Sequence, residues 1–292
     1  MDLDLTKRRG HRRRGLWAAA AGALLLAVLV AGAVGLSSRG KAAPDQLVPL
    51  YSAPGPSLWA TACSEVNGAH GGSFLVADIG AKQGPGPSRV AAWASVFHTC
   101  AGYGKASVLG YVWTDYGQGG MASVPGIEAQ VADWYSYYPG DIAGIFFDGA
   151  SDTVPGATTP NVTFYRTLAS YVHSKEGSHS KVVLNFGTNP TSGWMFAATA
   201  AENADIVVTF EGSYNTPGEN PYTSWAPASW ESHYPAHDFA AIVYDEDNAT
   251  DAALSQPSTA CKALRKENLG YLYAGTTYTD LPPEFTQMVA DC

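Results

Sequence analysis

The chain has 292 residues, of which 46% are hydrophobic and 15% charged, so it can bury a sizeable core. The first 41 residues hold eight Lys/Arg and two Asp/Glu. The remainder therefore carries nine basic and 24 acidic residues, a net charge of −15. So acidic a chain repels phosphates, which excludes nucleic acid as a partner and suits a neutral or cationic ligand.

The N-terminus has the pattern of a membrane-targeting segment. Residues 1–15 are basic, and the 21 residues of 16–36 carry no charge. A helix needs about 20 apolar residues to cross a bilayer, whereas the apolar region of a cleaved signal peptide has about 7–15. We therefore predict a transmembrane anchor at 16–36, with a cleaved signal peptide as the alternative. In both cases the basic segment stays in the cytoplasm, the rest is extracytoplasmic, and only this segment contacts the membrane.

A polar linker is predicted at 37–46, followed by a single domain at 47–292. All four cysteines of the chain lie in this domain: Cys63, Cys100, Cys261 and Cys292. An even number in an oxidising compartment indicates two disulfides. Three pairings are possible, and we favour the local ones, Cys63–Cys100 and Cys261–Cys292. We expect the domain to be a monomer.

Apolar runs of strand length alternate with helix-like stretches through the domain. The predicted strands are Leu47–Tyr51, Ser73–Asp78, Ser107–Trp113, Ile142–Phe147, Lys181–Asn185, Asp205–Phe210, Phe239–Tyr244 and Leu269–Tyr273. The predicted helices are Leu58–Val66, Ser88–Cys100, Ile127–Tyr138, Val162–Lys175, Trp194–Asn203, Trp225–Ser232, Asp251–Glu267 and Pro283–Asp291. This alternation, with continuously apolar strands, predicts an α/β protein with a TIM-type (β/α)8 barrel. An open, doubly wound sheet is the alternative.

Polar or aromatic residues follow nearly every predicted strand. In a (β/α)8 barrel the carboxyl ends of the strands carry the chemistry, although strand ends are often polar simply because loops begin there. The candidates for a binding site at these ends are Tyr51, Asp78, Trp113, Asp115, Asp148, Asn185, Glu211, Tyr244 and Tyr273.

Asp148 and Glu211 stand out because each directly follows a long apolar run and precedes a glycine, in "GIFFDG" and "IVVTFEG". Partial burial raises the pKa of a carboxyl group towards the range useful for an acid or a base. Two carboxylates across a pocket rich in Trp and Tyr are the apparatus of glycoside hydrolysis, and aromatic rings offer flat apolar faces to sugars. Trp93 and Trp134 lie within helix patterns and are expected in the core.

The signals for cofactors and metals are weak. A G-x-G-x-x-A pattern at 117–122 lies in the third βα unit rather than the first, and no helix follows it directly. His233 and His237 have helical spacing, but Pro235 lies between them. We expect neither a cofactor nor a metal.

Six segments resemble the spherulin-4-like (spherulation-specific family 4) proteins over about residues 47–281. They are "VPLYSAPG", "VLGYVWTDYG", "GIFFDG", "VVLNFGTNP", "VVTFEGSY" and "GYLYAGT". The family is similar to (β/α)8 glycoside hydrolases that cleave α-1,4-linked galactosamine polymers of microbial exopolysaccharide and biofilm matrix. The resemblance implies an endo-acting enzyme that retains configuration, with Asp148 as nucleophile and Glu211 as general acid/base.

One position departs from the family pattern. Fungal members often carry an adjacent acidic pair, "DE", after the fourth strand, whereas Gly149 follows Asp148 here. The alternative hypothesis is therefore a non-catalytic, surface-anchored carbohydrate-binding or spore-envelope protein on a degenerate glycosidase barrel.

Overall fold

The computed structural model describes residues 43–68, 72–118, 123–152, 161–177, 179–190, 204–216, 218–244, 264–266, 268–283 and 285–291. The chain divides into two units, Met1–Lys41 and Ala42–Cys292. The predicted membrane segment at 16–36 lies outside the described residues. Among the residues that are described, no helix is both long and apolar enough to cross a membrane.

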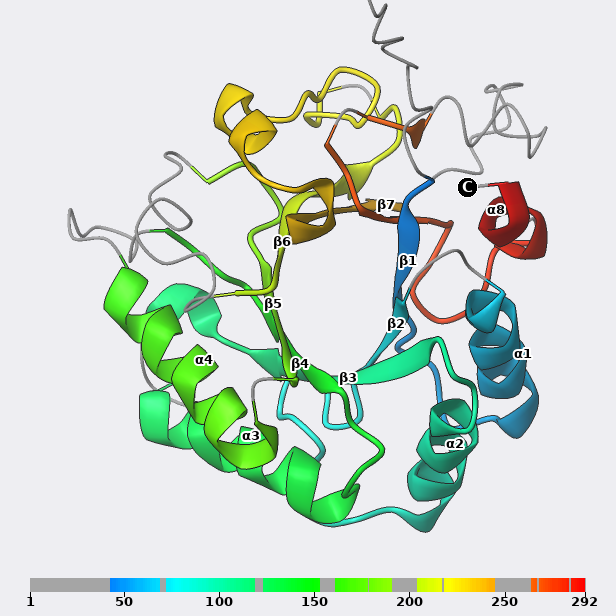
Figure 1. The fold of residues 1–292 in the computed structure, drawn as a ribbon, viewed down its shortest axis with the longest axis vertical. Coiled ribbons are helices and arrows are strands. Elements are labelled where there is room, and N and C mark those ends of the chain that lie inside the picture. Colours follow the sequence, from blue (N-terminus) through cyan, green and yellow to red (C-terminus); the bar gives the residue numbers. More distant parts are fainter. Residues whose placement is uncertain are drawn as a thin grey trace, which may run out of the picture. The chain divides into compact units, whose positions relative to one another are not determined.

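Eight parallel strands form a closed barrel in the order of the sequence, so the predicted (β/α)8 fold is confirmed and the open sheet is excluded (Figure 1). The strands are β1 Asp45–Pro49, β2 Ser73–Ala77, β3 Ala106–Trp113, β4 Gly144–Asp148, β5 Lys181–Asn185, β6 Ile206–Ser213, β7 Phe239–Tyr244 and β8 Tyr271–Ala274. β1 pairs with both β2 and β8, which closes the ring.

Five α-helices lie outside the ring of strands in the described part of the chain (Figure 1). They are α1 Pro56–Asn67, α2 Ala91–Ala101, α3 Val124–Tyr137, α4 Val162–Glu176 and α8 Phe285–Asp291. α1, α2, α3 and α4 each bury one apolar face against the strands of the barrel. The predicted helices Trp194–Asn203 and, almost entirely, Asp251–Glu267 lie outside the described residues.

The predicted helix Trp225–Ser232 is wrong. The structure has two short 3-10 helices instead, η3 Ser229–His233 and η4 Ala236–Asp238. Pro227 and Pro235 lie on either side of η3. Proline lacks an N–H and disfavours a helical conformation in the residue before it, so a full α-helix cannot extend through this segment.

The core continues from the barrel into an aromatic layer beneath the helices. Trp134 of α3 is fully buried and packs so closely on Gly110 of β3 that a Cβ there would lie 2.5 Å from the indole. The indole N–H also donates to the backbone carbonyl of Tyr111 at 3.0 Å. Trp93 is 5% exposed. The prediction that Trp93 and Trp134 belong to the core is therefore confirmed.

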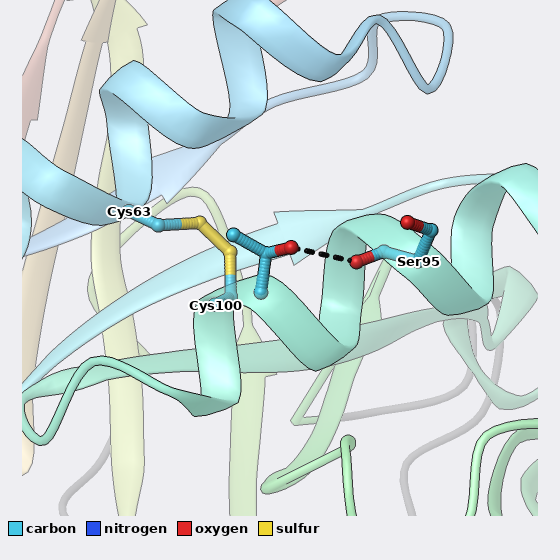
Figure 2. The surroundings of a disulfide bond; sticks show 4 residues. Cys63, Ser95 and Cys100 are labelled. Atoms are coloured by element: carbon cyan, nitrogen blue, oxygen red, sulfur yellow. Dashed lines mark hydrogen bonds between the residues drawn. A yellow bond between two sulfur atoms is a disulfide. The ribbon is translucent and has the colours of Figure 1, made fainter.

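A buried disulfide joins Cys63 of α1 to Cys100 of α2 (Figure 2). This is one of the two predicted pairs, and it ties together two neighbouring helices on the outside of the barrel. Cys261 and Cys292 lie outside the described residues, so their pairing stays a prediction.

Candidate active site

Two carboxylates lie near the carboxyl ends of β4 and β6, the strands on either side of β5. Asp148 is the last residue of β4, and Glu211 lies two residues before the end of β6. The register of β6 against β7 shifts at Thr209, where one extra residue is inserted just before Phe210 and Glu211. An inserted residue changes the alternation of side chains along a strand, and such irregularities commonly direct a side chain into a site.

Asn185, the last residue of β5, connects these two carboxylates. Its side-chain nitrogen donates to Asp148 Oδ1 at 2.7 Å and also to Glu211 Oε2. Its side-chain oxygen accepts the backbone N–H of Gly187 at 3.0 Å, which fixes the orientation of the amide because an N–H can only donate. One nitrogen thus serves both acids. The nearest oxygens of Asp148 and Glu211 therefore lie within about 6 Å, twice the length of an ordinary hydrogen bond.

Two tyrosines complete the hydrogen bonding of the acids. Tyr111 of β3 donates its hydroxyl to Asp148 Oδ2 at 2.6 Å, and Tyr278 of the loop after β8 donates to Glu211 Oε1 at 2.7 Å. Burial, followed by the nearby carboxylate, raises the pKa of both phenols well above the ordinary value. Both therefore remain protonated donors at any physiological pH.

The carboxyl group of Glu211 has an environment suited to holding a proton. Burial raises its pKa, and the charge of Asp148 raises it further, while the hydrogen bonds from Asn185 and Tyr278 act in the opposite direction. A carboxylic acid with a raised pKa can donate a proton to a leaving group and accept one back.

Three predicted aromatic residues lie around this pair in different roles. Tyr51 is partly buried and packs against the rings of Tyr111 and Tyr278. Tyr244 lines two cavities near Glu211. Tyr273, in contrast, is fully buried and donates its hydroxyl to the carbonyl of Thr277 at 2.9 Å. Tyr273 thus supports the loop that carries Tyr278.

Two cavities adjoin these residues, one at Glu211 and one at Tyr278. One, of about 330 Å³, is lined by Glu211 and Tyr244 together with Gly187, Thr188, Phe210, Gly212, Ser213, Glu219 and Asn220. The second, of about 280 Å³, is lined by Tyr244, Thr276, Thr277 and Tyr278. The larger cavity lies at the lower end of the size range of small-molecule sites, roughly 300–1,000 Å³.

The other predicted candidates lie at or just after the ends of β2 and β3, which are on the other side of β4 from β6. Trp113 is partly buried at the end of β3, and the Lys82 ammonium lies 4.1 Å from the centre of its ring. Asp78 accepts the backbone N–H of Lys82 at 3.2 Å, and burial raises the pKa of this acid. Asp115 begins the 3-10 turn Asp115–Gly117 with a left-handed φ of 48°. These residues border the site without taking part in the hydrogen bonds of the two central acids.

Gly149 explains the break in the family pattern after Asp148. Its φ is +63°, a conformation that other residues adopt only with strain. A Cβ at this position would lie 2.5 Å from the ring of Trp113. A second acid cannot follow Asp148 in this chain while Trp113 keeps its place.

Sequence reasoning did not identify Tyr111 and Tyr278. A signal for Tyr111 was present, because it lies two residues before Trp113 and therefore on the same face of β3. Tyr278 lies in a loop and carries no periodic signal. Among the described residues no group of three or more His, Cys, Asp and Glu is placed to hold a metal ion.

A (β/α)8 barrel with two linked carboxylates at its mouth is a glycosidase-like barrel. The chain belongs to the Spherulation-specific family 4, whose sequence model matches residues 46–292. No curated protein matches the chain.

The structure of Aspergillus clavatus Sph3 in complex with GalNAc is similar, with a TM-score of 0.67 and 19% identity over 86% of this chain and 97% of that one. At this identity the likeness establishes the fold. A β-mannanase from Mytilus edulis has a TM-score of 0.48 and 7% identity, covering 86% of this chain and 90% of its own. A chitinase from Rhizomucor miehei has 0.46 and 12%, covering 75% and 92%.

Proposed function

We propose that the domain is an extracytoplasmic glycoside hydrolase that cleaves an amino-sugar-containing, galactosamine-type exopolysaccharide from within the polymer. The observation that carries this proposal is the contact of one Asn185 amide with both Asp148 and Glu211. This contact supports the proposal because it keeps two acids close together at the carboxyl ends of the strands, where (β/α)8 enzymes carry their chemistry.

The environments of the acids support different roles. Glu211 has the raised pKa expected of the group that protonates the leaving oxygen. Asp148 accepts a hydrogen bond at each of its oxygens, from Tyr111 and Asn185, which orients it for attack on the anomeric carbon. Retaining enzymes separate their carboxyl groups by about 5–5.5 Å, and inverting enzymes by about 6.5–9.5 Å. A single bridging nitrogen favours the shorter spacing, and with it retention of configuration.

Two further observations support the substrate class and the location. The similar structure of Sph3 holds GalNAc, an amino sugar. The disulfide between Cys63 and Cys100 suits an oxidising compartment outside the cytoplasm. The domain's net charge of −15 also suits a polymer in which part of the amino groups are free and cationic.

The test uses purified residues 42–292 on a panel of exopolysaccharides that includes galactosamine-rich polymers. We expect release of oligosaccharides by the native protein, and loss of release in Asp148→Asn and Glu211→Gln. Asp238→Asn is the matched control, because Asp238 precedes β7 at the opposite end of the barrel. Proton NMR of the first product tells retention from inversion. Saturable glycan binding without turnover, unchanged in Asp148→Asn, would instead establish the non-catalytic binding protein.

A further inference from the structure

A third aromatic ring separates the two phenols that hold the acids. Tyr51, two residues after the end of β1, contacts Tyr111 with ring centres 5.5 Å apart at 78° and Tyr278 with ring centres 5.5 Å apart at 77°. The two contacts have the same length and the same edge-to-face geometry, which is a favourable arrangement for aromatic pairs. Tyr51 is therefore a spacer between Tyr111 and Tyr278.

With Tyr51 included, the side chains around the acids form a closed ring. Its members, in order, are Asp148, Asn185, Glu211, Tyr278, Tyr51 and Tyr111. The carboxylates are thus held on two sides. Asn185 holds them together by hydrogen bonds on one side, and the three tyrosine rings set their separation on the other.

Tyr51 also contacts the backbone of Tyr278, which lies in the loop after β8. Its backbone N–H donates to the carbonyl of Tyr278 at 2.6 Å, while Leu50 beside it donates to Val76 of β2. Tyr278 lies outside the strands, so this contact ties its loop to the end of β1. Within the described part of the chain the Tyr51 hydroxyl makes no hydrogen bond. The contacts that hold Tyr111 and Tyr278 therefore come from its ring and its backbone.

We propose that Tyr51 is a positioning residue whose ring sets the separation of Asp148 and Glu211 through Tyr111 and Tyr278. Its catalytic consequence rests on the proposed hydrolase function, whereas its geometric consequence does not. Because hydrolysis by a carboxylate pair depends on the separation of the two groups, an altered separation changes the rate of the chemical step more than the binding of the glycan.

The test compares Tyr51→Phe, which keeps the ring, with Tyr51→Leu, which removes it. We expect kcat and KM of Tyr51→Phe within about twofold of the native values. Tyr51→Leu loses two edge-to-face contacts, which predicts a fall in kcat of roughly 10- to 100-fold with little change in KM. Rescue by phenylalanine separates a role of the ring from a role of the hydroxyl.

A matched control is available at the other end of the barrel. Tyr234, ahead of β7, also has edge-to-face contacts with two rings, Trp230 at 78° and Phe239 at 76°. Tyr234→Leu removes comparable packing without touching the acids, so we expect native kcat and KM from it. Thermal unfolding of each variant shows that the protein compared is folded. If Tyr51→Leu does not fold, Tyr51→Met replaces it, because methionine adapts to irregular spaces.

Crystal structures of the native protein and of Tyr51→Leu supply a measurement that needs no turnover. We expect the variant to lose at least one of the two phenol–carboxylate hydrogen bonds and to change the separation of Asp148 from Glu211. An unchanged set of hydrogen bonds overturns the proposal, and so does a Tyr51→Phe variant as slow as Tyr51→Leu. If the native protein cleaves no glycan, the proposed function fails while this structural comparison still decides the role of Tyr51.

Discussion

Replacing Tyr278 by phenylalanine should move the pH dependence of catalysis in a direction that the hydrogen bonds dictate. The Tyr278 hydroxyl donates to Glu211 Oε1 at 2.7 Å, and this bond lowers the pKa of Glu211 against the opposing effect of burial. Phenylalanine removes the donor and keeps the ring. The charged form of Glu211 then loses support, so the pKa of the carboxyl group rises further.

The size of the change follows from the difference between two hydrogen bonds. A bond to a charged group contributes about 1.5–3 kcal/mol, and a bond between neutral groups about 0.5–1.5 kcal/mol. The ionised form of Glu211 therefore loses about 1–1.5 kcal/mol more than the protonated form. Since 1.36 kcal/mol corresponds to one pH unit, the transition moves upward by about one pH unit.

The assay is the pH profile of kcat/KM on a soluble oligosaccharide. As a general acid Glu211 must be protonated, so activity falls as pH rises through its pKa, and this alkaline limb should move to higher pH in Tyr278→Phe. The carbon-13 NMR titration of the Glu211 carboxyl, assigned with Glu211→Gln, should move in parallel. Tyr137→Phe is the control, because Tyr137 is the last residue of α3 and its hydroxyl donates to the carbonyl of Pro87 and not to either acid. An alkaline limb that stays in place or moves to lower pH in Tyr278→Phe would refute the reasoning.

Three further predictions concern stability. Burial raises the pKa of Glu231 to about 7 from 4.5, so this group stabilises the fold most below pH 4.5, and its contribution is lost as pH rises through about 7. Glu231→Gln should therefore raise the free energy of unfolding at pH 8 by on the order of 1–3 kcal/mol after allowance for screening, which raises Tm by several degrees. At pH 4 the same substitution should change Tm little. Gly149→Ala should lower the urea midpoint more than Gly140→Ala. Both glycines have positive φ, but a Cβ at Gly149 would lie 2.5 Å from the Trp113 ring, whereas a Cβ at Gly140 meets nothing within 4 Å. Equal effects would show that the Trp113 side chain moves aside at little cost. Cys63→Ala/Cys100→Ala opens a loop of 37 residues and should lose about 3–4 kcal/mol of unfolding free energy, and a reducing agent should lower the Tm of the native protein alone.

The parts of the fold that the sequence predicts well are those with a local cause. β5 and β7 begin and end at the predicted residues, because their apolar runs are bounded by polar residues or loops at both ends. β6 extends three residues beyond the prediction, since the residue inserted at Thr209 lets Glu211 and Gly212 continue pairing with β7. A register shift of this kind depends on the neighbouring strand and leaves no pattern in the sequence of β6 itself.

In the candidate site, too, the features with a local cause could be predicted and those that depend on neighbouring strands could not. Asp148, Glu211 and Asn185 could be predicted because a polar residue that follows an apolar run lies at the mouth of a barrel. That Asn185 joins the two acids could not, because the contact depends on how β4, β5 and β6 are staggered. The burial of Tyr273 could not be predicted for a similar reason. Its position at the end of β8 suggests a ligand, but the strand places its ring in the core.

The glycine after Asp148 now has a structural cause that bears on specificity. The N–H of Tyr116 donates to the carbonyl of Gly149 at 2.8 Å, and the Trp113 ring fills the space where a side chain at this position would lie. The Trp113 ring at the end of β3 therefore leaves no room for a side chain after Asp148. Asp148 and Glu211 nonetheless form a complete pair through Asn185, so a glycine after Asp148 leaves the proposed catalytic pair in place. Gly149 contacts the Trp113 side of the site, where the Lys82 ammonium lies over the indole ring. A difference in the preferred polymer should therefore follow from substitutions at Trp113 and Lys82, whereas loss of turnover should follow from substitutions in the ring around the acids.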